Sequence, residues 1–165
     1  MPRARAFAPL AALLLAASAT AQEPPVQPGK IGYSVATTSA SAGSLCSGFA
    51  CAPADLLVAR GATLTFAVRT NPGLPFVLLA GPNAQPCVTL PGILNQWAGP
   101  SLLVFAGTAN QNDTIRCWGG LATLALPVPT TTPLQTAVVT QVVADNGTAP
   151  AVPAFSQPVR ITVAS

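Results

Sequence analysis

Thr63-Leu-Thr-Phe-Ala-Val-Arg69 is the stretch that decides the fold class, because apolar and polar residues alternate along it. Successive side chains of a β-strand point to opposite faces, so this period of two predicts a strand with one buried face. We expect Leu64, Phe66 and Val68 to face the core, with Thr65 and Arg69 facing solvent.

The following sequence continues in short runs of the same kind. Residues 122–128 and 159–163 alternate between apolar and polar positions, which predicts two more half-buried strands. Residues 75–80 and 101–106 are continuous apolar runs, typical of strands covered on both faces. Residues 136–144 have two valines four apart, as a helix would, but their content of valine and threonine favours a strand.

Prolines and glycines separate these runs, and the chain contains 18 of the first and 13 of the second. The clusters that predict turns are Asn71-Pro72-Gly73, Gly81-Pro82-Asn83, Pro91-Gly92, Gly99-Pro100 and Asp145-Asn146-Gly147. This spacing leaves little room for long helices. We therefore predict one all-β domain over residues 31–165, an antiparallel β-sandwich of the immunoglobulin or fibronectin type.

The cysteines form an even set of four: Cys46, Cys51, Cys87 and Cys117. In an exported protein such a set predicts disulfides, with three possible pairings. We expect Cys46–Cys51, across a Gly- and Ser-rich segment able to fold back on itself, and Cys87–Cys117. A zinc site is the alternative, but these spacings lack the tight pairs of zinc ribbons. We therefore predict a disulfide-stapled domain that holds no metal.

The first 21 residues have the order of a secretory signal peptide. Arginines near the start precede an apolar run over residues 6–17, and Ala19-Thr20-Ala21 supplies small residues at a cleavage site. The apolar run is shorter than the roughly 20 residues that span a bilayer. A buried N-terminal helix is the alternative. We expect a mature chain that begins at Gln22, with a Pro-rich leader over residues 22–30 and no membrane span.

Charge and histidine content limit the possible chemistry. Seven basic residues less the two in the signal peptide leave five, and four acids bring the mature net charge to +1, against +3 for the whole chain. No basic cluster survives, so nucleic acid is not an expected partner. Histidine is absent, which excludes Ser-His-Asp and Cys-His catalytic sites.

The acids inside the domain are Asp55, Asp113 and Asp145. All three lie beside turn-like or polar sequence, where we expect them to be solvated rather than paired for acid–base catalysis. The polar segment Asn110-Gln-Asn-Asp113 could bind calcium, but it lacks the spacing of an EF-hand loop. The sequence therefore predicts no enzyme and no cofactor.

Trp97 lies in Asn95-Gln96-Trp97, between turn residues. An exposed indole ring beside amide side chains is a common way to build a sugar-binding face, so Trp97, Asn95 and Gln96 are the candidate ligand-binding residues. The alternative is that Trp97 covers a loop and that Trp118 packs on the expected Cys87–Cys117 bridge.

Four short motifs follow one another along the second half of the chain. They are Pro75-Phe-Val-Leu-Leu-Ala-Gly81, Gly119-Gly-Leu-Ala-Thr-Leu-Ala-Leu-Pro-Val-Pro129, Thr140-Gln-Val-Val143 and Ser156-Gln-Pro-Val-Arg-Ile-Thr-Val163. Over about residues 60–165 the series resembles the secreted β-rich domains of planctomycete-type bacteria. The resemblance implies an all-β fold and a secreted, bacterial protein. It implies no catalytic residue.

These observations favour a secreted, non-enzymatic module, structural or adhesive, at the cell surface or in the extracellular matrix. The alternative is a carbohydrate-binding module that uses an exposed Trp97. The expected partners of the protein are surface glycans or other extracellular proteins. The expected location is extracellular or at the cell surface, with the periplasm as the alternative.

Overall fold

The computed structural model of the chain describes residues 31–46, 51–82, 87–100, 102–114, 119–145 and 151–164. The expected signal peptide and leader lie outside these ranges, as do Cys117 and Trp118. The regular elements of the described residues are all strands. No helix in this part of the chain is long and apolar enough to cross a membrane.

The strands are short and follow the alternating and apolar runs of the sequence. In chain order they are β1 (Gly32–Ala36), β2 (Ser41–Ser44), β3 (Ala54–Ala59), β4 (Thr63–Thr70), β5 (Pro75–Gly81), β6 (Val88–Thr89), β7 (Gln96–Trp97), β8 (Leu102–Thr108), β9 (Gln111–Asn112), β10 (Gly120–Pro127), β11 (Ala137–Asp145), β12 (Pro153–Phe155) and β13 (Val159–Ala164).

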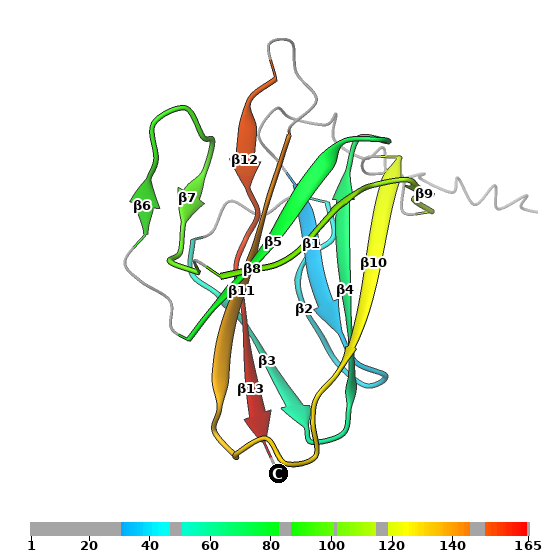
Figure 1. Cartoon of the computed structure of the whole chain (residues 1–165), viewed down its shortest axis with the longest axis vertical. Helices are drawn as coiled ribbons and strands as arrows, with labels where there is room; N and C mark the ends of the chain where they lie inside the picture. The colour runs from blue at the N-terminus through cyan, green and yellow to red at the C-terminus, as the bar shows by residue number, and fades with distance from the viewer. Residues whose placement is uncertain are drawn as a thin grey trace, which may run out of the picture.

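Two sheets face each other (Figure 1). The first has the order β2-β1-β4-β10-β9, and the second has the order β3-β13-β11-β5-β8, with β12 also beside β11. Strands β6 and β7 form a separate small hairpin. The β3–β13 pair is parallel, and the other pairs of the described strands are antiparallel. This confirms the predicted all-β fold, with antiparallel sheets packed as a sandwich.

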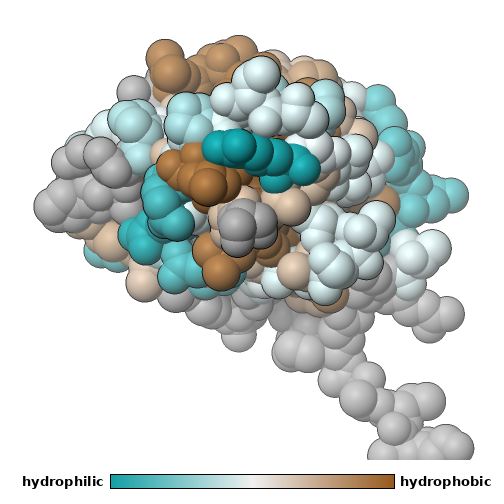
Figure 2. Space-filling model, turned by 90° about the horizontal axis from the view of Figure 1, so that it is seen from below, coloured by the Kyte–Doolittle hydropathy of each residue, from teal (hydrophilic) through white to brown (hydrophobic). Residues whose placement is uncertain are grey.

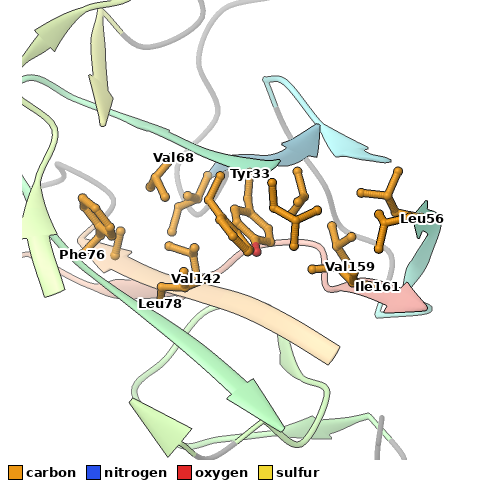
Figure 3. Close-up of a cluster of buried hydrophobic side chains, with 14 of the residues drawn as sticks. Tyr33, Leu56, Val68, Phe76, Leu78, Val142, Val159 and Ile161 are labelled. Carbon is orange, nitrogen blue, oxygen red and sulfur yellow. The ribbon is translucent and has the colours of Figure 1, made fainter. Parts of the chain in front are cut away.

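The core lies between the sheets and is built from the alternating positions. Leu64, Phe66 and Val68 of β4 are 8%, 5% and 2% exposed, as predicted. They pack with side chains from β1, β3, β5, β11 and β13 (Figure 3). Arg69 was expected to face solvent, and this is wrong: its side chain is buried. The reason is an ion pair with Asp113 on the outer side of the sheet.

One hydrogen bond crosses this apolar core from sheet to sheet. Tyr33 of β1 is fully buried, and its hydroxyl donates to Oγ1 of Thr140 on β11 at 2.7 Å. Thr140 in turn donates to the carbonyl oxygen of Val159 on β13 at 3.2 Å. Figure 3 shows the Tyr33 ring reaching between the two sheets. Both hydroxyls are therefore satisfied, which removes most of the cost of burying them.

Strand β8 differs from the prediction for residues 101–106. That apolar run was expected to be covered on both faces, yet Leu102 and Leu103 are each 66% exposed. Among the described residues β8 pairs with β5 alone, so it is an edge strand. The doubly covered strand is β11, where Val139 and Val142, which lie on opposite faces of the sheet, are both buried.

Seen from below, the end at which the C-terminus lies, apolar side chains reach the surface in separate groups with polar ones between them (Figure 2). Such a surface is expected of a chain in which only 7% of residues are charged.

Tyr33 makes a testable prediction, because it is the only tyrosine of the chain. Burial raises the pKa of its hydroxyl above the ordinary value of 10.0, although the hydrogen bond to Thr140 lowers it in part. The unfolded chain therefore loses this proton first, and stability that is present below pH 10 should fall as pH rises further, by about 1.4 kcal/mol per pH unit.

The measurement is urea unfolding between neutral pH and strongly alkaline pH. Tyr33→Phe should lose about 1 kcal/mol at neutral pH, since one buried hydrogen bond is removed. The same variant should also lose most of the alkaline slope. An equal alkaline slope in both proteins would contradict the burial of the Tyr33 hydroxyl.

Candidate functional site

The candidate ligand-binding residues lie in a segment that leaves the sandwich between β5 and β8. We call residues 87–100 the hairpin segment, because they contain the paired strands β6 and β7. In Figure 1 these two strands lie at the side of the second sheet, beyond β12. Ala98 and Pro100 of this segment are buried against the domain. The hairpin segment is thus a third layer on part of the sandwich.

A disulfide anchors the start of the hairpin segment. Cys51, just before β3, is bonded to Cys87, just before β6, with the Cα atoms 5.9 Å apart. The predicted pairs Cys46–Cys51 and Cys87–Cys117 are therefore wrong. Cys46 follows β2 in the first sheet, whereas Cys51 precedes β3 in the second, so the two cysteines flank strands of different sheets. Cys46 is also disulfide-bonded, and its partner lies outside the described residues.

The Cys51–Cys87 bond closes a loop with a sequence separation of 36 residues. In the chain-entropy model a loop of this length stabilises the fold by about 4 kcal/mol. The gain comes from restricting the unfolded chain. Its structural effect is to tie the start of the hairpin segment to the residues just before β3.

Gln141 of β11 anchors the other end of the hairpin segment. Its side chain is fully buried on the outer face of the second sheet. Oε1 accepts a hydrogen bond from the backbone N–H of Ala98 at 3.0 Å. Nε2 donates to the carbonyl oxygens of Gln96 at 2.9 Å and of Ser156 at 2.8 Å. One side chain thus joins β11, the hairpin segment and the β12–β13 connection.

Backbone pairing with β12 completes the anchoring. The N–H of Leu94 donates to Pro153 O at 2.8 Å, and the N–H of Phe155 donates to Leu94 O at 3.0 Å. Asn95 follows in a left-handed conformation, with φ of 63°, which asparagine tolerates better than most residues. Its side-chain Nδ2 donates to Phe155 O at 2.7 Å.

The three candidate ligand-binding residues therefore differ in what they offer. Asn95 uses its amide nitrogen within the fold. Trp97 is half-buried, and its indole N–H donates to Pro100 O at 2.9 Å. Gln96 has an exposed side chain beside it. The structure brings the three together at one end of a small hairpin, but it uses two of their donors internally. What Trp97 offers a ligand is part of its ring.

Two of the three acids inside the domain, Asp113 and Asp55, take part in ion pairs. Asp113 Oδ1 lies 3.4 Å from Nε of Arg69, and these side chains are only 1% and 9% exposed. Arg69 also donates from Nη1 to Ser34 Oγ at 3.3 Å. Asp113 was expected to be solvated, and this is wrong, because β9 pairs with β10 and carries it onto the sheet beside Arg69.

The second ion pair is at the surface. Asp55 Oδ1 lies 3.2 Å from Nη1 of Arg160, with side chains 66% and 41% exposed. These residues are register partners on the parallel strands β3 and β13. Pairs this exposed contribute little to stability. Among the residues that the structure describes, no three His, Cys, Asp or Glu side chains lie close enough to hold a metal ion.

Gln141 was not identified from the sequence as a structurally important residue. It appeared only within the motif Thr140-Gln-Val-Val143 that carried the resemblance. A glutamine among valines in a predicted strand is the available signal, because a polar residue in such a run needs internal partners once it is buried. The alternation alone predicts such a residue to face solvent.

Comparison of the chain with protein-family models and with curated proteins gives no match.

The role of Gln141 can be measured by replacing it with leucine. Gln141→Leu removes the acceptor of the buried Ala98 N–H and the donor to two carbonyl groups, and should cost about 2–3 kcal/mol of unfolding free energy. Gln96→Leu makes the same chemical change at an exposed side chain and should cost less than about 0.5 kcal/mol. Urea unfolding of both variants tests this. Equal losses would mean that the hairpin segment is not anchored through Gln141.

Proposed function

We propose that this chain is a secreted, non-enzymatic module that serves a structural or adhesive role at the cell surface or in the extracellular matrix. The observation that carries the proposal is the anchoring of the hairpin segment by the Cys51–Cys87 bond and by Gln141. A segment held by a covalent bond and a buried side chain is a rigid display element. It suits a protein whose task is to present a fixed surface.

The placement of the reactive side chains supports a non-catalytic role. The buried carboxylate of Asp113 is paired with Arg69, and the buried hydroxyl of Tyr33 donates to Thr140. These groups stabilise the fold. Histidine is absent from the sequence, so acid–base chemistry near neutral pH would fall to other side chains. Among the described residues, Asp55 and Asp113 already take part in ion pairs.

The proposed location rests on two features of different kinds. The first 21 residues have the pattern of a signal peptide. The Cys51–Cys87 disulfide is of the kind that persists in oxidising compartments. The resemblance to secreted domains of planctomycete-type bacteria agrees with both and stays a prediction.

A second candidate function is carbohydrate binding at Trp97. In its favour, the side chain of Trp97 is half-buried and is held in place by the bond from its N–H to Pro100 O, next to the exposed side chain of Gln96. A fixed aromatic ring can stack on a sugar at low entropic cost. Against it, the indole N–H and the Asn95 Nδ2 are already used as donors.

The proposal is tested by following the protein in the cells that make it. The mature chain, beginning at Gln22, should be recovered from the cell envelope, the matrix or the medium. Its N-terminal mass should lack the first 21 residues. Purified material should turn over no glycoside, ester or peptide substrate. Unprocessed protein in the cytoplasm, or turnover lost in Asp113→Asn with the fold intact, would contradict the proposal.

A glycan array separates the two functions. If the module is structural or adhesive without sugar recognition, wild type and Trp97→Ala should give the same array. Glycan binding that disappears in Trp97→Ala and returns in Trp97→Phe would favour the second function, because phenylalanine restores a stacking ring without the indole N–H.

A further inference from the structure

An apolar cavity of about 210 Å³ lies between the two sheets and is partly open to solvent. Its inner wall consists of buried core side chains, and its outer wall of partly exposed ones. The lining residues are Leu64, Phe66, Leu78, Ala80, Val104, Leu126, Val138, Thr140 and Ile161.

The strand pairing explains why the sandwich is open here. Within the described residues, β9 pairs with β10 only at Gly120 and Leu121, so the rest of β10 has no neighbour on that side. In the facing sheet β8 is likewise an edge. Leu126 of β10 and Val104 of β8 both line the cavity. The cavity therefore opens between the edge strands of the two sheets.

The chemistry of the lining restricts what could enter. Thr140 is the one lining residue with a polar side chain, and its hydroxyl already accepts from Tyr33 and donates to Val159 O. A polar group placed inside would find no side-chain donor, and the second lone pair of Thr140 Oγ1 as its one side-chain acceptor, so it would carry most of the cost of lost hydration. The part of a ligand that enters must therefore be hydrocarbon.

We propose that this cavity binds the alkyl tail of a small amphiphile, with the polar head remaining in water at the mouth. The volume is sufficient, because an apolar cavity of about 150 Å³ already binds benzene. The partial opening favours an amphiphile over a fully enclosed hydrocarbon, since one end of the ligand stays solvated. Val104, 44% exposed, stands at the transition between the two environments.

The probe is n-octyl β-D-glucoside below its micelle concentration, with methyl β-D-glucoside as the control that has the same head and no tail. We expect saturable 1:1 binding of the octyl compound by calorimetry and none of the methyl compound. The hexyl and heptyl compounds should bind progressively more weakly, by about fourfold for each methylene removed. Methyl-group shifts in NMR spectra should locate the tail at Leu126, Val138 and Ile161.

Two variants tie the binding to the cavity. Ala80→Phe places a ring in the cavity and should weaken binding more than about tenfold. Val104→Thr, at a partly exposed position where the fold tolerates a hydroxyl, should weaken it several-fold. Leu57→Thr makes a related change on β3, 67% exposed and outside the lining, and should leave binding unchanged.

Three results would overturn the proposal. They are no saturable binding of the octyl compound, equal affinity in wild type and Ala80→Phe, and shifts confined to the exposed Leu102 and Leu103, which would indicate surface adsorption. Since the proposed structural or adhesive role rests on the hairpin segment, it is independent of the cavity, and either proposal can fail alone.

Discussion

The structure depends on two adjacent side chains of β11 that point to opposite faces of the second sheet. Thr140 faces the core and accepts the hydrogen bond that Tyr33 donates from the other sheet. Gln141 faces outward and binds the hairpin segment through Ala98 and Gln96. Because a strand alternates its faces, two neighbouring residues can join three layers. Strand β11 thus lies in the middle of the second sheet and contacts both the first sheet and the hairpin segment.

This arrangement is costly unless every polar atom has a partner. A buried hydroxyl or amide without one loses about 1–3 kcal/mol, while a satisfied one contributes modestly to stability. Tyr33 and Thr140 meet this requirement with each other and with Val159 O. Gln141 meets it with three backbone groups. The polar groups select one registration of sheets and hairpin segment, whereas apolar packing alone is less specific about geometry.

The alternation of β4, β10 and β13 was sufficient to predict the fold, because a strand in a sandwich has one face in the core and one face outside. The same pattern says nothing about what covers the outer face. The burial of Arg69 was therefore missed, because it results from an ion pair with Asp113. The burial of Gln141 was missed because the hairpin segment covers it. Residues 101–106 were misjudged for a related reason. A run of apolar residues looks the same whether a neighbouring strand covers it or, as in β8, it forms an exposed edge.

The disulfide pairing and the internal hydrogen bonds of the candidate site could not be predicted either, because both depend on which strands the fold brings together. Proximity in sequence favoured Cys46–Cys51, but the two cysteines flank strands of different sheets, and the pairing follows the topology. The residues around Trp97 were identified as a cluster from their composition. The bond from Trp97 to Pro100 O is local, but the bond from Asn95 to Phe155 O depends on a fold that brings β12 beside the hairpin segment.

The central claim is that Gln141 makes the hairpin segment part of the folded domain rather than a loop attached to it. Amide hydrogen exchange of the Ala98 N–H, the donor to Gln141 Oε1, tests this most directly. The account predicts that this amide exchanges as slowly as the Val142 N–H of β11, because both would require opening of the domain. Exchange of Ala98 at the rate of the exposed turn residue Gly92 would contradict it.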